Sequence, residues 1–247
     1  MFPIRDHNPS GRTPYVTYAL IAINIVVFVS YWPLFDDPRT LNAFFRDWAM
    51  HPISVSNGRE YYSLVTSMFL HGGWMHLAGN MLFLWVFGDN LEDEMGHVGY
   101  LVFYLAAGVA ASLAEVVAAP LSGVPTVGAS GAIAGVMGGY LLLFPKAKVD
   151  ILIIIVIIFR ILPIPAWIVL SVWLAMQIFG GFNAVQGSGG VAYWAHAGGF
   201  VAGIVMTLPV FLRLGGPRFW ARTHGHPPHP EARYELARSR IPKVRRK

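Results

Sequence analysis

Cysteine is absent from the 247-residue sequence, and charged residues make up only 13% of it. The lack of cysteine excludes disulfide bonds and a thiol nucleophile. The charged fraction is about half of the ~25% that soluble domains carry, which argues against a soluble protein. The zinc-binding motif H-E-x-x-H is also missing, which disfavours a metalloprotease. We therefore expect neither a metal ion nor a cofactor.

Hydrophobic residues make up 55% of the chain and occur in blocks long enough to cross a membrane. A membrane-spanning helix needs roughly 20 largely apolar residues, with a range of about 17–25. The blocks predict an all-α integral membrane protein with six transmembrane helices. An even number of spans places both termini on one side of the membrane. The predicted spans are 16–32, 76–91, 98–119, 130–145, 164–180 and 193–212.

Positive charge is concentrated near the termini. Ten of the 18 lysines and arginines lie in 213–247, whereas the loop 33–75 between the first two spans holds three. Positive residues remain on the cytoplasmic side of a membrane, so both termini are expected there. The net charge of +5 then reports topology rather than nucleic-acid binding, because the tail has no interleaved readout motif.

Composition divides the chain into three segments: a cytoplasmic lead at 1–14, a membrane domain at 15–212 and a basic tail at 213–247. The tail is rich in proline, histidine and arginine, which predicts disorder. Its stretch H-G-H-P-P-H-P at 224–230 is an alternative metal binder, although a disordered His-rich tail is favoured.

The apolar, β-branched stretch 151–165 resists assignment. It fits an interfacial strand-like segment or the start of a kinked fifth span. As a separate span, its dozen or so residues would be too short. It would also place the basic tail on the outer side, so we reject a seventh span.

Polar residues inside membrane spans are costly and by default indicate function. His76 and Asn80 are four residues apart, so they share one face of the second predicted helix. Both side chains can donate hydrogen bonds. The alternative role is a polar contact between helices, which histidine and asparagine also supply in membranes.

Ser130 lies between glycines at the start of a short fourth span. The 15 residues from Ser130 to Phe144 cover ~22 Å, less than the ~30 Å hydrocarbon core. The helix is therefore expected to begin below the outer surface, with loop 120–129 dipping in to reach it. Irregular backbone at that depth must be buried in protein or line a cavity. We expect Ser130 at the floor of a cavity open to the outside.

Small residues recur on two spans. Gly131, Gly135 and Gly139 follow Ser130, and Gly199 and Gly203 lie on the face of His196. Such rows let helices approach closely, which would bring Ser130 near His196. A hydroxyl beside an imidazole is the minimal activated nucleophile. The alternatives are a helix N-cap for Ser130 and a hydrogen-bonded core histidine for His196.

No third, acidic member is expected beside this pair. Glu115 lies near the outer end of its span, where reaching to water is the simpler account, and Glu92 lies far from the proposed site. An oxyanion needs hydrogen-bond donors, and the Ser130 backbone N–H, His76 and Asn80 can supply them. Gly128 and Gly131 would let a substrate backbone approach closely.

Several motifs together resemble those of the rhomboid intramembrane serine proteases. They are "GASG" at 128–131, "HAGG" at 196–199, "FLHGGWMHLAGN" at 69–80 and "FGDNLEDEMG" at 87–96. The resemblance covers roughly 48–207. It implies a six-helix protease whose active site opens to the outer face.

By motif, Ser130 resembles the family's nucleophile and His196 its general base. His76, Asn80 and the Ser130 N–H resemble the oxyanion hole, and Gly128 and Gly131 resemble the glycines that flank the nucleophile. His71 and Glu92 resemble structural residues. One departure is that Tyr62 and Ser63 stand where the family often has Trp-Arg, which concerns the anchoring of the outer loop rather than the chemistry.

The sequence thus predicts an intramembrane serine endopeptidase that cleaves transmembrane proteins near the outer membrane face. Its partners would be transmembrane substrates and the lipid bilayer, with no nucleic acid. A multi-pass location in a bacterial inner membrane is expected. The alternatives are a non-catalytic rhomboid-like protein that binds membrane segments, and a small transporter. A transporter would show repeated halves, which the sequence lacks.

Overall fold

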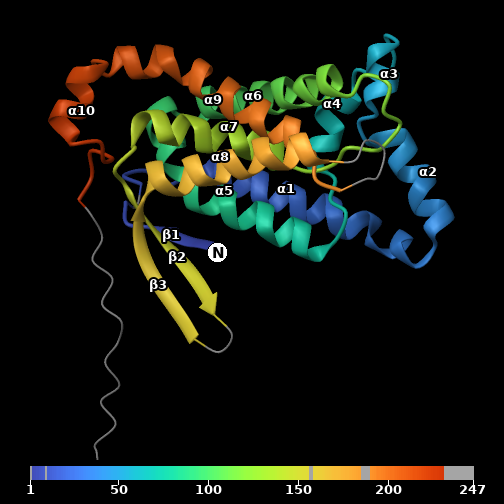
Figure 1. Cartoon of the computed structure of the whole chain (residues 1–247), viewed down its shortest axis with the longest axis horizontal. Coiled ribbons are helices and arrows are strands. Elements are labelled where there is room, and N and C mark those ends of the chain that lie inside the picture. The colour runs from blue at the N-terminus through green and yellow to red at the C-terminus, as the bar shows by residue number, and fades with distance from the viewer. Residues whose placement is uncertain (1, 9, 156–157, 185–189, 231–247) are drawn as a thin grey trace, which may run out of the picture.

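The computed structural model describes residues 2–8, 10–155, 158–184 and 190–230. Within these residues, six helices of at least 14 residues run along one common direction (Figure 1). Each begins and ends within four residues of a predicted span, so the positions of the helices are confirmed. They are α1 (Tyr15–Tyr31), α5 (Trp74–Met95), α6 (His97–Ala118), α7 (Ser130–Leu143), α8 (Ala166–Asn183) and α9 (Tyr193–Arg213).

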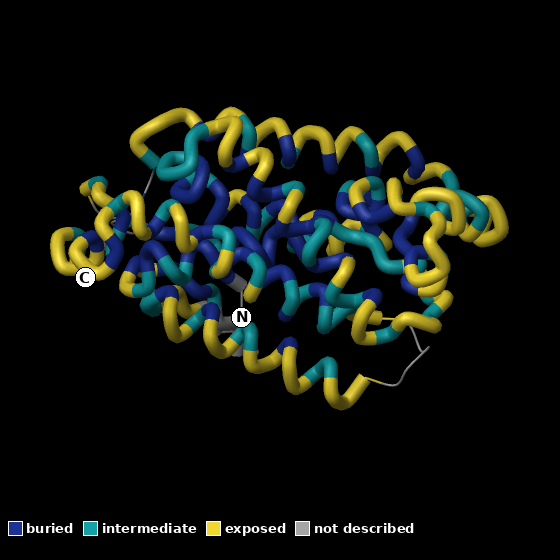
Figure 2. The backbone as a smooth tube through the Cα atoms, turned by 90° about the horizontal axis from the view of Figure 1, so that it is seen from above, coloured by how far each residue is buried: buried dark blue, intermediate teal, exposed yellow. Residues whose placement is uncertain are grey.

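Large apolar side chains cover the outside of this bundle. In the described part of the chain, four helices are long and apolar enough to cross a membrane: α1 with the turn that follows it, α6, α8 and α9. α7 is apolar but shorter, at 14 residues. Figure 2 shows that the outer faces of the helices are exposed while the centre is buried. Outward-facing side chains include Val26, Val117, Phe179 and Leu212, which suits contact with lipid.

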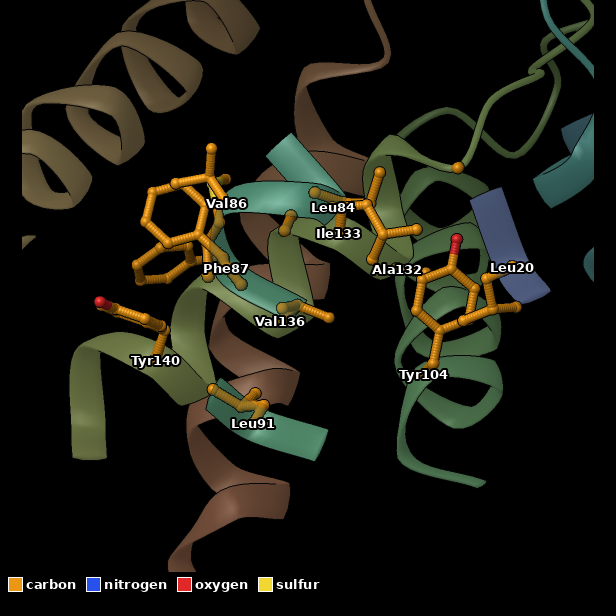
Figure 3. Close-up of a cluster of buried hydrophobic side chains, with 14 of the residues drawn as sticks. Leu20, Leu84, Val86, Phe87, Leu91, Tyr104, Ala132, Ile133, Val136 and Tyr140 are labelled. Atoms are coloured by element: carbon orange, nitrogen blue, oxygen red, sulfur yellow. The ribbon is translucent and has the colours of Figure 1, made fainter. Parts of the chain in front are cut away.

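Helix α7 is the centre of the bundle. Its residues 131–140 are all buried, because glycine and alanine at many positions let four helices approach it. Figure 3 shows the larger side chains of α7 packed among those of the surrounding helices. The cluster includes Ala132, Ile133, Val136 and Tyr140 of α7, Leu84, Val86, Phe87 and Leu91 of α5, Leu20 of α1 and Tyr104 of α6.

A three-stranded antiparallel sheet accompanies the helices, so the fold is mostly helical rather than all-α as expected. The sheet has the order β1 (Phe2–Asp6), β2 (Lys148–Ile155), β3 (Ile158–Pro165). Its register pairs Asp6 with Val149, and Val149 with Ile164. Residues 151–155 and 158–165 therefore belong to two paired strands and not to the fifth span, which begins at Ala166. β-branched residues favour strands, and apolar runs this short do not distinguish strand from helix.

The segment between α1 and α5 is folded into short helices at the end of the bundle opposite β1 (Figure 1). Tyr62, which stands in place of the family's tryptophan, anchors this segment: its hydroxyl donates to the Asp47 carbonyl over 2.8 Å and its ring packs edge-on against Trp48. The short helices are η1 (Trp32–Asp36), α2 (Pro38–Trp48), α3 (Pro52–Ser56), α4 (Ser63–Thr66) and η2 (Ser67–Phe69).

Polar contacts fix the opposite end, where β1 and α10 lie (Figure 1). The carboxylate of Glu92 accepts hydrogen bonds from the backbone N–H groups of Val16 and Thr17, so it caps the first turn of α1. This is the structural role expected of Glu92. The lead 1–14 is also tied to the bundle, because β1 is paired with β2.

The first part of the basic tail is folded, which differs from the expected disorder. Helix α10 (Pro217–Thr223) buries Phe219 near Phe144, and the indole of Trp220 donates to the Leu142 carbonyl. In the His-rich stretch, His229 pairs with Asp93. The remaining expectation of disorder concerns 231–247, which lie outside the described residues.

Candidate active site

The site is built on a glycine seam between α7 and α9. A side chain added at Gly199 would collide with the carbonyl oxygen of Gly131, and one added at Gly203 would collide with that of Gly135. The two backbones are therefore in direct contact, as the rows of small residues predict. Ser130 and His196 lie in the first turns of these two helices, so the close contact of the helices limits the positions that their side chains can take.

Ser130 and His196 form a hydrogen-bonded pair. The hydroxyl oxygen of Ser130 lies 2.8 Å from Nε2 of His196. Ser130 is the first residue of α7, and His196 lies in the first turn of α9. The predicted proximity of the two side chains is thus present in the structure, and this distance suits proton transfer from hydroxyl to imidazole.

Gln177 of α8 holds the other side of the His196 ring, a contact that the sequence analysis missed. Its Oε1 lies 2.8 Å from His196 Nδ1, and its Nε2 donates to the Trp173 carbonyl over 3.3 Å. A carbonyl can only accept, so the amide nitrogen faces Trp173 and the amide oxygen faces the ring. His196 then carries its proton on Nδ1, and Nε2 is free to accept the proton of Ser130.

The rule that polar residues in spans indicate function would have found Gln177, because it interrupts the apolar run "WLAMQIF". Glu115 also differs from expectation. Its carboxylate accepts a hydrogen bond from the Ala195 backbone N–H over 2.9 Å, so the idea that it merely reaches for water is wrong. It satisfies a donor in the first turn of α9 and thereby fixes the residue before His196.

His76 faces the same site in a defined tautomer. The Gly72 backbone N–H donates to His76 Nδ1 over 3.2 Å, so the neutral ring carries its hydrogen on Nε2. Gly128 keeps the space in front of this N–H open. It has a φ of 129°, and a side chain there would lie 2.8 Å from His76 Nε2 and 3.5 Å from Ser130 Oγ. Only glycine fits this position.

Two further donors belong to residues that line the same region. Asn80 is buried and its Nδ2 has no hydrogen-bond partner among the described residues. The backbone N–H of Ser130 belongs to the first turn of α7, where helical partners are absent. Gly131 packs against Ala111 of α6 rather than against open space, so it supports helix packing at this point. The expected role of Gly131 in substrate approach stays a prediction.

These groups line one cavity of about 1220 Å³. Its walls include His76, Asn80, Gly128, Ser130, Gly131 and His196, together with the loop 120–128. The cavity lies where α7 and α9 begin, at the end of the bundle away from β1 and α10 (Figure 1). All six site residues predicted from the sequence therefore meet in one place.

His71 lies behind the site and not in it. It is fully buried, and its ring stacks edge-on against His76 with centroids 5.1 Å apart. Its backbone is held by Tyr31, whose hydroxyl accepts from the His71 N–H and donates to the His71 carbonyl. Contacts of this kind suit the structural role expected of His71, which supports the ring that faces the cavity.

Comparison with known proteins identifies the family. A model described as "Rhomboid domain" matches residues 58–213, which is well over half of the chain. This chain belongs to the rhomboid family. The matched region of the rhomboid contains every one of the six site residues and ends with α9, while β1, α1 and α10 lie outside it. Membership of this family and the presence of apolar helices long enough to cross a membrane identify the rhomboid as an integral membrane protein.

Named relatives agree with this assignment. The rhomboid is 31% identical over 200 residues to "Rhomboid protein 1, mitochondrial" of Saccharomyces cerevisiae, covering 77% of this chain and 51% of the yeast protein. It is 34% identical over 129 residues to "Putative rhomboid protease YdcA" of Bacillus subtilis, covering 52% of this chain and 61% of that one. With "Rhomboid protease GluP" of the same bacterium it shares 37% identity over 134 residues, 52% of this chain and 24% of GluP. The chain thus spans about half the length of the yeast relative.

Proposed function

We propose that this chain is an intramembrane serine endopeptidase in which Ser130 is the nucleophile and His196 the general base. The observation that carries the proposal is the 2.8 Å contact between Ser130 Oγ and His196 Nε2 in a cavity lined by hydrogen-bond donors. Family membership and the names of two Bacillus relatives as proteases support the same conclusion.

The chemistry follows from the positions of the protons. As Ser130 Oγ attacks a peptide carbonyl, His196 Nε2 takes the hydroxyl proton, and the imidazolium then donates this proton to the leaving amine. Water next attacks the acyl-enzyme, with His196 again acting as the base. The cavity supplies this water in a region otherwise surrounded by apolar helices.

Three donors would stabilise the oxyanion of the tetrahedral intermediate: Nε2–H of His76, Nδ2 of Asn80 and the Ser130 N–H. Each is without a protein acceptor among the described contacts of the site, so it can bind the oxyanion without first breaking another bond. Preorganised donors of this kind supply a large share of catalysis in acyl transfer.

Gln177 acts as a positioning residue in this proposal. Its Oε1 holds Nδ1–H of His196, which keeps the basic nitrogen turned toward Ser130. Because an amide is neutral, it orients the ring without the charge that the aspartate of a Ser-His-Asp triad contributes. The site is thus a dyad with an oriented base.

The substrate class is inferred from where the cavity lies. We propose six spans with both termini in the cytoplasm, so that the cavity opens toward the outer face and receives transmembrane proteins near the outer end of a span. The membrane domain is assigned to 15–212. We propose a bacterial inner membrane, with the Bacillus relatives as support; the yeast relative, by its name, is mitochondrial.

The test is cleavage of a model transmembrane substrate in lipid vesicles by the purified chain and by its Ser130→Ala variant. The proposal expects a product with the parent, cut near the outer end of the substrate span, and none with the variant. Both proteins should unfold at the same temperature. A folded parent that binds the substrate without cutting it would instead favour the non-catalytic rhomboid-like binding protein.

A further inference from the structure

The hairpin of β2 and β3 leaves the bundle sideways. Figure 1 shows it at the end where α7 finishes and α8 begins, running across the helix axes rather than along them. A direction across the helices is a direction along the membrane surface. The hairpin therefore extends over the bilayer beside the bundle instead of reaching into the aqueous space.

Its base is firmly attached. Val149 and Ile151 are buried, and β1 pairs along one edge of β2. Asp150 accepts hydrogen bonds from Arg5 and His7, each over 2.7 Å. β3 pairs along this fixed β2, with Leu162 opposite Ile151, which gives β3 a defined position relative to the membrane-crossing helices.

Both faces of β3 carry exposed apolar side chains at this level. Ile161 is 37% exposed and Leu162 is 42% exposed. Neighbouring residues in a strand point to opposite faces, so each face carries an exposed apolar side chain. Between Ile151 and Pro165 the sequence contains one charged residue, Arg160, which is exposed. A protein docked on the sheet would cover one face, whereas lipid surrounds both.

The neighbouring elements indicate the depth. Exposed Trp167 lies in the first turn of α8, directly after β3, and Trp220 of α10 lies at the same end. Tryptophan concentrates at the boundary between hydrocarbon and headgroups. Exposed Lys148, Arg218 and Arg222 are also at this end, and basic side chains there attract anionic headgroups.

We propose that the β2–β3 hairpin lies in the headgroup layer of the leaflet on the side of the termini, with an anionic lipid surface as its partner. The headgroup layer suits the backbone as well. In the described part of the chain only β2 pairs with β3, and an unpaired strand edge is not tolerated in hydrocarbon. At the interface water and headgroups satisfy this edge, while Pro163 and Pro165 remove two of its donors.

The absence of cysteine makes the test clean. Ile161→Cys and Leu162→Cys are each labelled with a nitroxide, in vesicles of phosphatidylcholine and phosphatidylglycerol. Collision rates with oxygen, which enters lipid, and with a neutral nickel chelate, which stays in water, are measured by electron paramagnetic resonance. Val172→Cys on the exposed face of α8 is the lipid control, and Ser56→Cys on α3 is the water control.

The proposal expects a ratio of oxygen to nickel collisions at both hairpin positions between those of the two controls and severalfold above that of Ser56→Cys. Nickel access equal to that of Ser56→Cys at either position would overturn it. So would a label shielded from both reagents, since that result means a protein contact such as a second copy of the chain. None of these outcomes depends on proteolytic activity, and unfolding temperatures matching the parent show that the variants fold.

Discussion

His196 is held from two sides that are built in different ways. On one side, Ser130 reaches it across the α7–α9 seam, where glycines bring the two backbones into contact. On the other side, Gln177 belongs to α8, of whose 18 residues only Ala166, Leu170 and Gln177 are buried. The seam sets the distance between Ser130 and His196 through the backbone. The loosely packed α8 sets only the orientation of the ring, through one side chain.

The seam is broken by Gly199→Val. The new side chain would meet the Gly131 carbonyl and force α7 and α9 apart, and a displacement of about 1 Å can cost on the order of 10²-fold in rate. We expect cleavage of a transmembrane substrate to fall by about 10²-fold or more. Gly99→Val is the matched control, because its added carbon meets only Met95 at 3.6 Å. Equal losses in both variants would show that the seam has no special role.

α5 forms a third wall of the cavity and carries two of the proposed oxyanion donors, His76 and Asn80. Asn80→Ala removes one donor, which typically costs roughly 10²–10³-fold in kcat. We expect a loss near the lower end of this range, since His76 and the Ser130 N–H remain and water can enter. The measurement is kcat and KM for a fixed substrate. Parental kcat in both Asn80→Ala and His76→Ala would mean that the two residues serve helix packing.

The loosely packed side is tested by Gln177→Leu. Losing the partner of Nδ1–H lets the ring turn and leaves a buried donor unpaired, which costs ~1–3 kcal/mol. We expect kcat to fall about 10- to 100-fold with little change in KM. Gln177→Glu, which restores an acceptor, should recover part of this loss. Met176→Leu, at the neighbouring exposed position, is the control. A variant Gln177→Leu with parental kcat would remove Gln177 from the mechanism.

Asp6→Asn, at the end of the bundle away from the cavity, is expected to have the smallest effect on activity. Asp6 is buried and accepts hydrogen bonds from Asn90 and Tyr140. Burial, with a further contribution from the negative charge of Asp89, raises the pKa of Asp6 to about 8. The folded protein therefore holds this proton between about pH 4 and pH 8, while the unfolded chain releases it, so the free energy of unfolding falls as pH rises through this window.

Asp6→Asn mimics the protonated carboxyl group and should remove this fall, a difference on the order of 4 kcal/mol between pH 5 and pH 8. Thermal unfolding of parent and variant is compared from pH 5 to pH 9. The curves should separate toward high pH, where the parent loses stability, while cleavage at pH 7 changes little. Parallel curves would mean that Asp6 titrates normally.

The α7–α9 seam could be predicted from the sequence, whereas the α8 side of His196 could not. Spacing along the chain is enough to find helices and rows of small residues, so the six helix positions and the approach of Ser130 to His196 were predicted. Gln177 stands out in the sequence as a polar residue in an apolar run, but its contact with His196 depends on how α8 turns about its axis, so this contact was not predicted. Glu115 was misread because its acceptor role toward Ala195 requires knowing that α6 and α9 are neighbours. The hairpin was left open because hydropathy does not separate short strands from helices.

The central claim is that the α7–α9 seam makes Ser130 a nucleophile activated by His196. Labelling with a serine-reactive fluorophosphonate, followed by mass spectrometry of the peptides, measures this without any substrate. We predict one adduct, on Ser130, in the parent. It should be lost in His196→Ala and Gly199→Val, and slowed but present in Gln177→Leu. An adduct on another residue, or labelling of Ser130 at the parental rate in His196→Ala, would contradict the claim.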